Sequence, residues 1–134
     1  MYFPCGSEHS QMMIISMEKE GAGHSRRLMM ALWEYLEPLI DIRFIIICDG
    51  DVNIQDWNDV IWAVTTRMDP TRDTLMLKER TENPSIRSKM GLDATNKLPG
   101  EALREWGTPI KKDPTIVEKI DSIWETLNIF PDNK

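Results

Sequence analysis

The sequence has few of the residues on which several functional classes depend. Among 134 residues there are only two Cys and two His. Cys5 and Cys48 cannot build a disulfide framework or a cysteine-rich zinc site, and no paired-histidine metal motif can be written. Lys and Arg number 16 against 22 Asp and Glu, which gives a net charge of −6. This balance argues against nucleic-acid binding, because the neutralisation of phosphates requires clustered basic residues.

The sequence also lacks long apolar segments. No apolar run approaches the roughly 20 residues that a membrane-spanning helix needs. The first residues show no basic patch followed by an apolar stretch, so no signal peptide is expected and the predicted compartment is cytoplasmic. Hydrophobic residues make up 41% of the chain and charged residues 28%, which is typical of a folded protein.

Apolar runs alternate with amphipathic segments over the first half of the chain. Three short runs predict buried strands, and the middle run, Phe44–Cys48, has no polar alternation, which predicts a central strand. Apolar side chains at helical spacing predict one helix between each pair of strands. This order is typical of an α/β fold, here a three-layer α/β/α arrangement with a mainly parallel or mixed sheet. The predicted strands lie near residues 11–17, 43–48 and 73–77.

Capping residues indicate where the helices begin and end. Pro38 should end the first helix at about Glu37, because a residue before proline avoids helical geometry. Asn53 is expected to cap the second helix, and Asp69-Pro70 to stop it. Asp113-Pro114 is typical of the start of a final helix. The helical stripes predict that four Trp have core-packing roles: Trp33, Trp57, Trp62 and Trp124.

These patterns predict one domain with four parts. They are a leader at 1–10, a βαβαβ unit at 11–77, a loop-rich segment at 78–112 and a C-terminal helix at 113–128.

Two turns partly resemble ligand-binding loops. Gly21-Ala22-Gly23 precedes the first helix, with Arg26 just inside it, where bare N–H groups could meet a phosphate. The third glycine of the dinucleotide fingerprint is missing, so an ordinary strand-to-helix turn is favoured. Asp49–Asn53 begins like a calcium loop but lacks the glycine and the final glutamate of that motif. The sequence therefore predicts no cofactor site and no metal site in this chain.

Other polar residues give weaker signals. Six charged residues cluster around the second predicted helix and its exit: Asp56, Asp59, Arg67, Asp69, Arg72 and Asp73. One interpretation is a solvent-exposed face with helix caps. The other is a set of ion pairs that fixes either the turn at 65–75 or a subunit contact. His9 and His24 are expected in turns or at the surface, and no local signature of nucleophilic catalysis is present. Trp106 lies in a predicted loop beside Arg104. This pair suits an interface, because aromatic and Arg side chains anchor protein contacts.

Four longer segments carry a family resemblance. They are D-W-N-D-V-I-W-A-V-T-T-R-M-D-P-T-R-D-T at 56–74, S-K-M-G-L-D-A-T-N-K-L-P-G-E at 88–101, R-E-W-G-T-P-I-K-K-D-P at 104–114 and I-D-S-I-W-E at 120–125. In this order they resemble the C-terminal part of the UbiD family, the 4-hydroxy-3-polyprenylbenzoate decarboxylases and related aromatic-acid (de)carboxylases. The resemblance extends over roughly residues 14–130.

The resemblance implies a division of labour. Family members hold prenylated FMN (prFMN), a divalent metal and a monovalent cation in a larger upstream domain that also carries the catalytic residues. The C-terminal domain supports oligomerisation and closes over the active site. The chain is therefore expected to be such a domain, or a split subunit, that forms homo-oligomers or joins a separate flavin-domain subunit. The implied substrates are aromatic or unsaturated carboxylic acids.

The chain departs from the family pattern in two places. The loop before S-K-M-G is usually longer and rich in Pro, Gly and apolar residues, but here it is the charged segment 78–87. Gly50 replaces the second acid of the acidic turn. Lys89 and Met90 match the family motif and are expected at the rim of the substrate pocket. The charged segment motivates an alternative hypothesis, a repurposed non-catalytic binding module that retains the fold.

Overall fold

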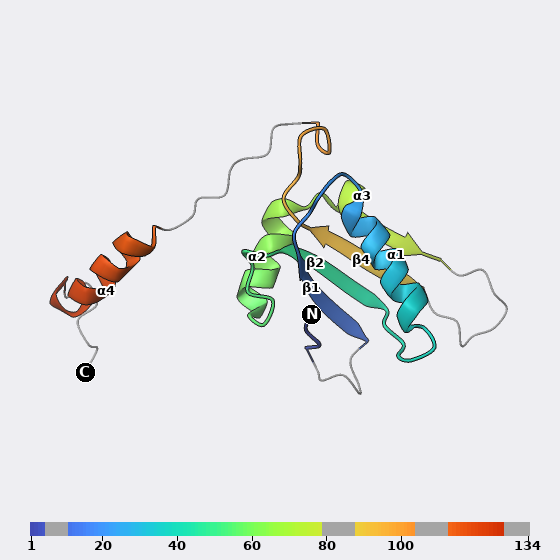
Figure 1. Cartoon of the computed structure of the whole chain (residues 1–134), viewed down its shortest axis with the longest axis horizontal. Coiled ribbons are helices and arrows are strands. Elements are labelled where there is room, and N and C mark those ends of the chain that lie inside the picture. The colour runs from blue at the N-terminus through green and yellow to red at the C-terminus, as the bar shows by residue number, and fades with distance from the viewer. Residues whose placement is uncertain (5–10, 79–87, 104–112, 128–134) are drawn as a thin grey trace.

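A computed structural model describes residues 1–4, 11–78, 88–103 and 113–127 of the chain (Figure 1). In chain order its elements are β1 (Met12–Met17), α1 (His24–Leu36), β2 (Phe44–Asp49), α2 (Trp57–Arg67), α3 (Pro70–Asp73), β3 (Thr74–Leu77), β4 (Lys89–Ala94) and α4 (Pro114–Leu127). None of the described helices is long and apolar enough to cross a membrane.

The four strands form one mixed sheet in the order β1-β2-β4-β3. Strands β1, β2 and β4 are parallel, and β3 runs antiparallel to β4 at the edge. Ile46 of β2 lies between Ile14 of β1 and Leu92 of β4. The prediction that the run Phe44–Cys48 forms a central strand is therefore confirmed.

Helices cover both faces of the sheet (Figure 1). Side chains along a strand alternate between faces, so Met13 and Ile45 pack with Met29 and Trp33 of α1. The adjacent residues, such as Ile14 and Ile46, pack on the other face with Val60 and Ala63 of α2. The predicted three-layer α/β/α arrangement is confirmed.

The segment predicted to be loop-rich, 78–112, contains β4, which the strand prediction missed. Gly91 and Asp93 interrupt its apolar pattern, although both have structural causes. A Cβ atom at Gly91 would collide with the Met29 sulfur and would lie 3.2 Å from Cη2 of Trp33. The third parallel strand is therefore β4. The strand β3, which ends the predicted βαβαβ unit, lies where it was expected but runs antiparallel to β4.

Side chains cap the starts of α2 and α4, but one of the predicted caps is wrong. Asp56, and not Asn53, caps α2 by accepting a hydrogen bond from the backbone N–H of Asn58 at 2.9 Å. The side chain of Asn53 instead accepts from the backbone N–H of Gln55 within the preceding turn. Asp113 accepts from the backbone N–H of Thr115 at the start of α4, as predicted.

The core roles predicted for the four Trp hold only for Trp33, which is buried. Trp57, Trp62 and Trp124 are each about half exposed. Helix α2 turns the smaller side chains of Val60 and Ala63 toward the sheet. Trp57 and Trp62, which the sequence analysis assigned to the core, therefore lie on the outer side of α2.

The outer edge of β1 is partly covered by the N-terminal residues. Tyr2 and Ile14 exchange two backbone hydrogen bonds, with N···O distances of 2.7 and 2.9 Å. This antiparallel bridge satisfies backbone groups of an edge strand that would otherwise face solvent.

Candidate functional site

The carboxyl ends of the three parallel strands bring together polar residues that are distant in sequence. Lys19 follows β1, Asp49 ends β2, and Asp93 lies near the end of β4. In open α/β sheets, ligands bind outside the carboxyl ends of the strands. This edge of the sheet, with the loops that border it, is therefore the candidate site.

One part of the site is built around Lys97, whose side chain is 1% exposed. Its Nζ donates to the Asp93 backbone oxygen at 2.9 Å and lies 3.3 Å from Oδ1 of Asp73. Arg72 binds both carboxylate oxygens of Asp73, at 2.8 and 2.6 Å. Burial on its own raises the pKa of Asp73. The hydrogen bond from Arg72, the Asp69 N–H and the charge of Lys97 outweigh it, and the pKa lies below its ordinary value.

A second part joins β1 to the loop after β4. Nζ of Lys19 lies 2.6 Å from Oε2 of Glu101 and donates to Oγ1 of Thr95 at 3.1 Å. Glu101 also accepts from the backbone N–H groups of Leu98 at 2.8 Å and Gly23 at 3.4 Å. Burial raises the pKa of Glu101, but Lys19 and these N–H donors outweigh it and lower the pKa below its ordinary value.

The third part is centred on Arg67 at the end of α2. Its guanidinium donates to Asp49 at 2.9 Å and to both carboxylate oxygens of Asp51, each also at 2.9 Å. The same Asp49 oxygen accepts from the backbone N–H of Asn96 at 2.6 Å. The guanidinium carbon lies 4.8 Å from the centre of the Trp62 ring, in cation–π geometry. Arg67 thus ties α2 to the ends of β2 and β4.

The two interpretations of the charged residues around α2 each hold for some of them. Asp56 and Asp69 act as caps of α2 and α3. Arg72 and Asp73 form an ion pair, and Arg67 pairs with the acidic turn after β2, which the sequence analysis had not connected to it. These contacts fix the exit of α2 within one chain.

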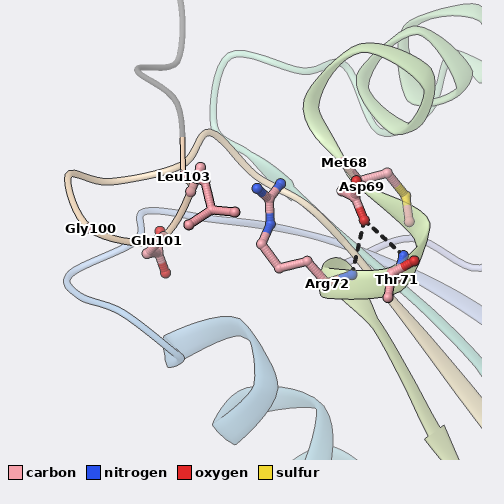
Figure 2. Close-up of a pocket in the computed structure, with 8 residues that line it drawn as sticks. Met68, Asp69, Thr71, Arg72, Gly100, Glu101 and Leu103 are labelled. Atoms are coloured by element: carbon pink, nitrogen blue, oxygen red, sulfur yellow. Dashed lines mark hydrogen bonds between the residues drawn. The ribbon is translucent and has the colours of Figure 1, made fainter.

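An open cavity of about 800 Å³ lies beside these ion pairs (Figure 2). In Figure 2 the side chain of Arg72 extends from α3 toward the loop that carries Glu101 and Leu103. Arg26 of α1 donates to the backbone oxygen of Arg72, so a hydrogen bond connects α1 to α3 beside the cavity. Leu103 is fully exposed. The cavity combines an apolar rim with charged groups that already have partners, which suits contact with another protein surface better than acid–base chemistry.

Cys48 does not supply a nucleophile to this site. It lies in the core of the sheet, and burial raises the pKa of its thiol to about 12. The thiolate is the reactive form of cysteine, so this thiol is unreactive at neutral pH.

The residues that the sequence placed at a substrate-pocket rim lie elsewhere in the sheet. Lys89 and Met90 form the amino end of β4, the opposite end from the cavity. Lys89 pairs with Glu37 at 3.2 Å. A rim role for these two residues stays a prediction. The interface residues Arg104 and Trp106 lie outside the described residues, as do Cys5 and His9.

His24 is the first residue of α1, and its Nδ1 accepts from the backbone N–H of Glu20 at 3.3 Å. Sequence reasoning missed the roles of Lys19, Lys97 and Glu101. Lys19 and Lys97 each follow a strand by two or three residues. Recognition of β4 would therefore have placed them at one edge of the sheet.

The glycine turn before α1 does not fit a flavin phosphate. Gly23 has a φ of 72°, and its N–H donates to the Glu101 carboxylate, which Lys19 holds in place. A phosphate at this helix start would meet a fixed negative charge. Within the described part of the chain, no group of three or more His, Cys, Asp or Glu is placed to hold a metal ion.

The fold and the site define a small α/β domain whose strand ends are closed by internal ion pairs. Residues 1–98 match the family model of the 3-octaprenyl-4-hydroxybenzoate carboxy-lyase C-terminal domain, UbiD_C. The chain therefore belongs to the UbiD family and corresponds to its C-terminal domain.

Solved UbiD-class structures are similar to this chain. Vanillic acid decarboxylase of Sedimentibacter hydroxybenzoicus in its closed form matches with a TM-score of 0.75 and 23% identity over 90% of this chain and 27% of that chain. HmfF of Pelotomaculum thermopropionicum in complex with FMN matches with a TM-score of 0.53 and 32% identity, over 72% of this chain and 23% of that chain. An evolved dimeric form of HmfF in complex with prFMN matches with a TM-score of 0.59 and 28% identity, over 78% of this chain and 21% of that chain. The chain thus spans about a quarter of the length of these solved chains.

Proposed function

We propose that this chain is the C-terminal domain, or a split subunit, of a UbiD-like decarboxylase that acts on aromatic or unsaturated carboxylic acids. In this proposal prFMN, a divalent metal and a monovalent cation are held by a flavin domain or partner subunit. This chain supplies surfaces for assembly and for closure of the active site, works in the cytoplasm, and is not catalytic alone.

The observation that carries the proposal is the family match combined with the internally paired strand ends. The match is to the C-terminal domain of a carboxy-lyase, and the chain spans about a quarter of the solved chains. At the candidate site, Lys19, Lys97 and Arg67 are each bound by carboxylates of the same chain. Such pairs fix loops in position, whereas a general acid or base needs a proton that it can exchange with substrate.

A closing role is supported by the vanillic acid decarboxylase, which has been solved in closed and open forms. Both forms resemble this chain in fold, with TM-scores of 0.75 and 0.72. The carboxyl edge of the sheet, with its cavity and exposed Leu103, is the surface we propose to face the flavin domain.

The test is complementation. The full chain is mixed with a prFMN-loaded flavin-domain subunit of a UbiD-class enzyme from the same genome, and CO₂ release from a panel of hydroxybenzoic acids is measured. We expect activity only when both components are present. Leu103→Asp should reduce complementation at least about tenfold, because it places a charge in an apolar contact. Met30→Asp, an equally polar change on exposed α1, is the matched control and should keep activity. Decarboxylation by the 134-residue chain alone would refute the proposal.

The cofactor assignment has its own test. Titration of the purified chain with FMN, followed by flavin fluorescence, should show no saturable quenching, because Glu101 occupies the start of α1. Micromolar quenching that is lost in Arg26→Ala would show that the glycine turn binds the flavin phosphate.

The alternative, a repurposed binding module, is favoured by the charged segment at 78–87. It predicts that the chain neither associates with a flavin-domain subunit nor changes the activity of one. Co-purification of the two proteins would exclude it.

A further inference from the structure

The loop after β4 has a firmly held first part and a lightly held second part. In the first part, the backbone N–H of Asn96 donates to Asp49 at 2.6 Å, and the side chain of Lys97 is 1% exposed. We name the second part, residues 98–103, the strap. No residue of the strap belongs to either core cluster of the described residues, and Leu103 is fully exposed. Burial of apolar surface therefore contributes little to holding the strap in place.

The side chain of Glu101 fastens the strap to the rest of the fold. Its Oε2 lies 2.6 Å from Nζ of Lys19, which follows β1, and its Oε1 accepts from the N–H of Gly23 before α1 at 3.4 Å. Within the strap, Glu101 also closes a turn with Leu98 through two hydrogen bonds, at 2.8 and 3.0 Å. The strap thus begins with a small closed turn whose carboxylate reaches out to β1 and α1.

The fastening covers a buried cation that has further partners. The side chain of Lys19 is 3% exposed, and its Nζ lies 3.7 Å from Oδ2 of Asp93. The same Nζ donates to Oγ1 of Thr95 at 3.1 Å and to the backbone oxygen of Asn96 at 3.3 Å. A buried charge is costly mainly when it loses all its partners. Because Lys19 keeps three of them when Glu101 leaves, the strap can open without leaving an isolated buried charge.

The strap also forms one wall of the cavity in Figure 2. Residues 100–103 line the cavity on one side, and residues of the α2 exit and α3 line it on the other. Gly100 has a φ of 89°, a left-handed conformation that favours glycine, at the third position of the turn that Leu98 and Glu101 close. Movement of the strap therefore opens or closes this wall without moving a residue of the core clusters.

We propose that the strap opens and closes one wall of the cavity while the sheet stays folded, and that the Glu101 carboxylate is its latch. Segments with little buried apolar surface open locally at a smaller free-energy cost than the core does. The closed strap presents Leu103 at the carboxyl edge of the sheet, and the open strap removes that surface. The inference goes beyond the proposed function, because the latch belongs to the chain alone.

Lysine labelling in urea tests whether the strap opens on its own. The full chain is treated with an amine-acylating reagent at urea concentrations below the unfolding transition, and the labelling rates of single lysines are read by mass spectrometry. Opening of the strap exposes little surface, so the rate at Lys19 should be nearly independent of urea. Lys97 is held in the folded edge by Asp73 and Asp93, so its rate should rise steeply with urea, as global unfolding does.

Two results of this experiment would overturn the proposal. Equal urea dependence at Lys19 and Lys97 would show that the strap and the sheet open together. Labelling of Lys19 as fast as that of Lys119, which is exposed on α4, would show that the strap does not close over it.

Glu101→Gln tests the latch directly. It removes the charge and keeps the size of the side chain, so the rate at Lys19 should rise at least about tenfold, the effect of losing one charged hydrogen bond. Glu18→Gln is the matched control, because Glu18 is an exposed neighbour of Lys19, and it should label like the parent.

Gly100→Ala tests the strap without altering a group that contacts Lys19. The added Cβ meets no atom within 4 Å, but alanine is strained at a φ of 89°. The closed turn should therefore be disfavoured, and labelling of Lys19 should speed up at least about fivefold. Gly50→Ala, which also adds a Cβ in open space but at an ordinary φ, should not change it. Unchanged rates in both Glu101→Gln and Gly100→Ala would refute the latch, and the complementation test of the proposed function would still stand.

Discussion

The carboxyl edge of the sheet and the outer faces of α1 and α4 are opposite in character. At the edge, buried Lys19, Lys97 and Arg67 are all paired with carboxylates of the same chain. On the outer helix faces, large apolar side chains such as Tyr35 and Ile120 are exposed. The edge is complete within one chain, whereas the helix faces gain stability only by contact with another surface. The ion pairs of the edge therefore stabilise the fold, whereas the exposed apolar side chains are available for contact with another surface.

The largest expected effect comes from breaking a buried ion pair at the edge. Lys97→Met removes the cation that lies 3.3 Å from Asp73 and 3.4 Å from Asp93 and leaves their carboxylates with one fewer partner. We expect the free energy of unfolding to fall by about 3–5 kcal/mol, the range for one lost partner of a buried pair. Urea unfolding followed by circular dichroism measures it. Lys89→Met is the control: it pairs with the exposed Glu37 and should cost less than about 1 kcal/mol. Equal losses in the two variants would contradict the comparison.

The next effect concerns the packing of α1 on β4. Gly91→Ala places a Cβ atom against the side chains of Met29 and Trp33. These side chains must shift, which should cost about 1–3 kcal/mol in the free energy of unfolding. Gly50→Ala is the matched control, because no atom lies within 4 Å of its added Cβ, and it should stay within about 0.5 kcal/mol. A Gly91→Ala variant as stable as the parent would show that α1 adjusts freely.

The edge should also determine how the chain responds to acid. The pKa values of Asp73 and Glu101 in the folded chain lie below their ordinary values of 3.8 and 4.5. As the pH falls, the unfolded chain therefore binds protons first, and the stability that these groups contribute is lost as the pH drops through their folded-state pKa values. We expect the melting temperature to fall from about pH 5 downward. Glu101→Gln should flatten this fall, whereas Glu18→Gln, at an exposed position, should follow the parent curve.

The smallest effect separates α4 from the sheet. Asp113→Ala removes the cap that accepts from the backbone N–H of Thr115 at 2.9 Å. It should weaken α4 by about 1 kcal/mol and lower the helical signal in circular dichroism. The urea midpoint of the sheet, followed by Trp33 fluorescence in a background in which the other four Trp are Phe, should not move. A coupled loss of both signals would show that α4 and the sheet unfold together.

The fold could be predicted from the sequence where local pattern and tertiary role agree. The apolar runs of β1 and β2 and the helical spacing of α1 met this condition, and their predicted positions are confirmed. The sequence pattern hides β4, because Gly91 is selected by its contact with α1 and Asp93 by its pairing with Lys97. The residues that these two positions contact all lie outside β4, so the pattern of the strand itself does not reveal them.

The candidate site shows the same limit more strongly. The caps at Asp69 and Asp113 are local, and sequence spacing identified the positions. The partners of Lys19 and Arg67 lie 82 and 16–18 residues away, at Glu101 and in the acidic turn after β2. Spacing along one helix does not reveal such pairs, because they depend on which strand ends are neighbours. Likewise, the stripe of α2 did not show whether Val60 or Trp57 would face the sheet.

The bridge between Tyr2 and Ile14 has a consequence for solubility. An uncovered edge strand is a template on which other chains can add as further strands and start aggregation. The two backbone hydrogen bonds of Tyr2 occupy that template at the middle of β1, and the opposite edge is the four-residue strand β3, too short to pair over a long register. Both edges of the sheet therefore offer little backbone for open-ended growth by strand addition.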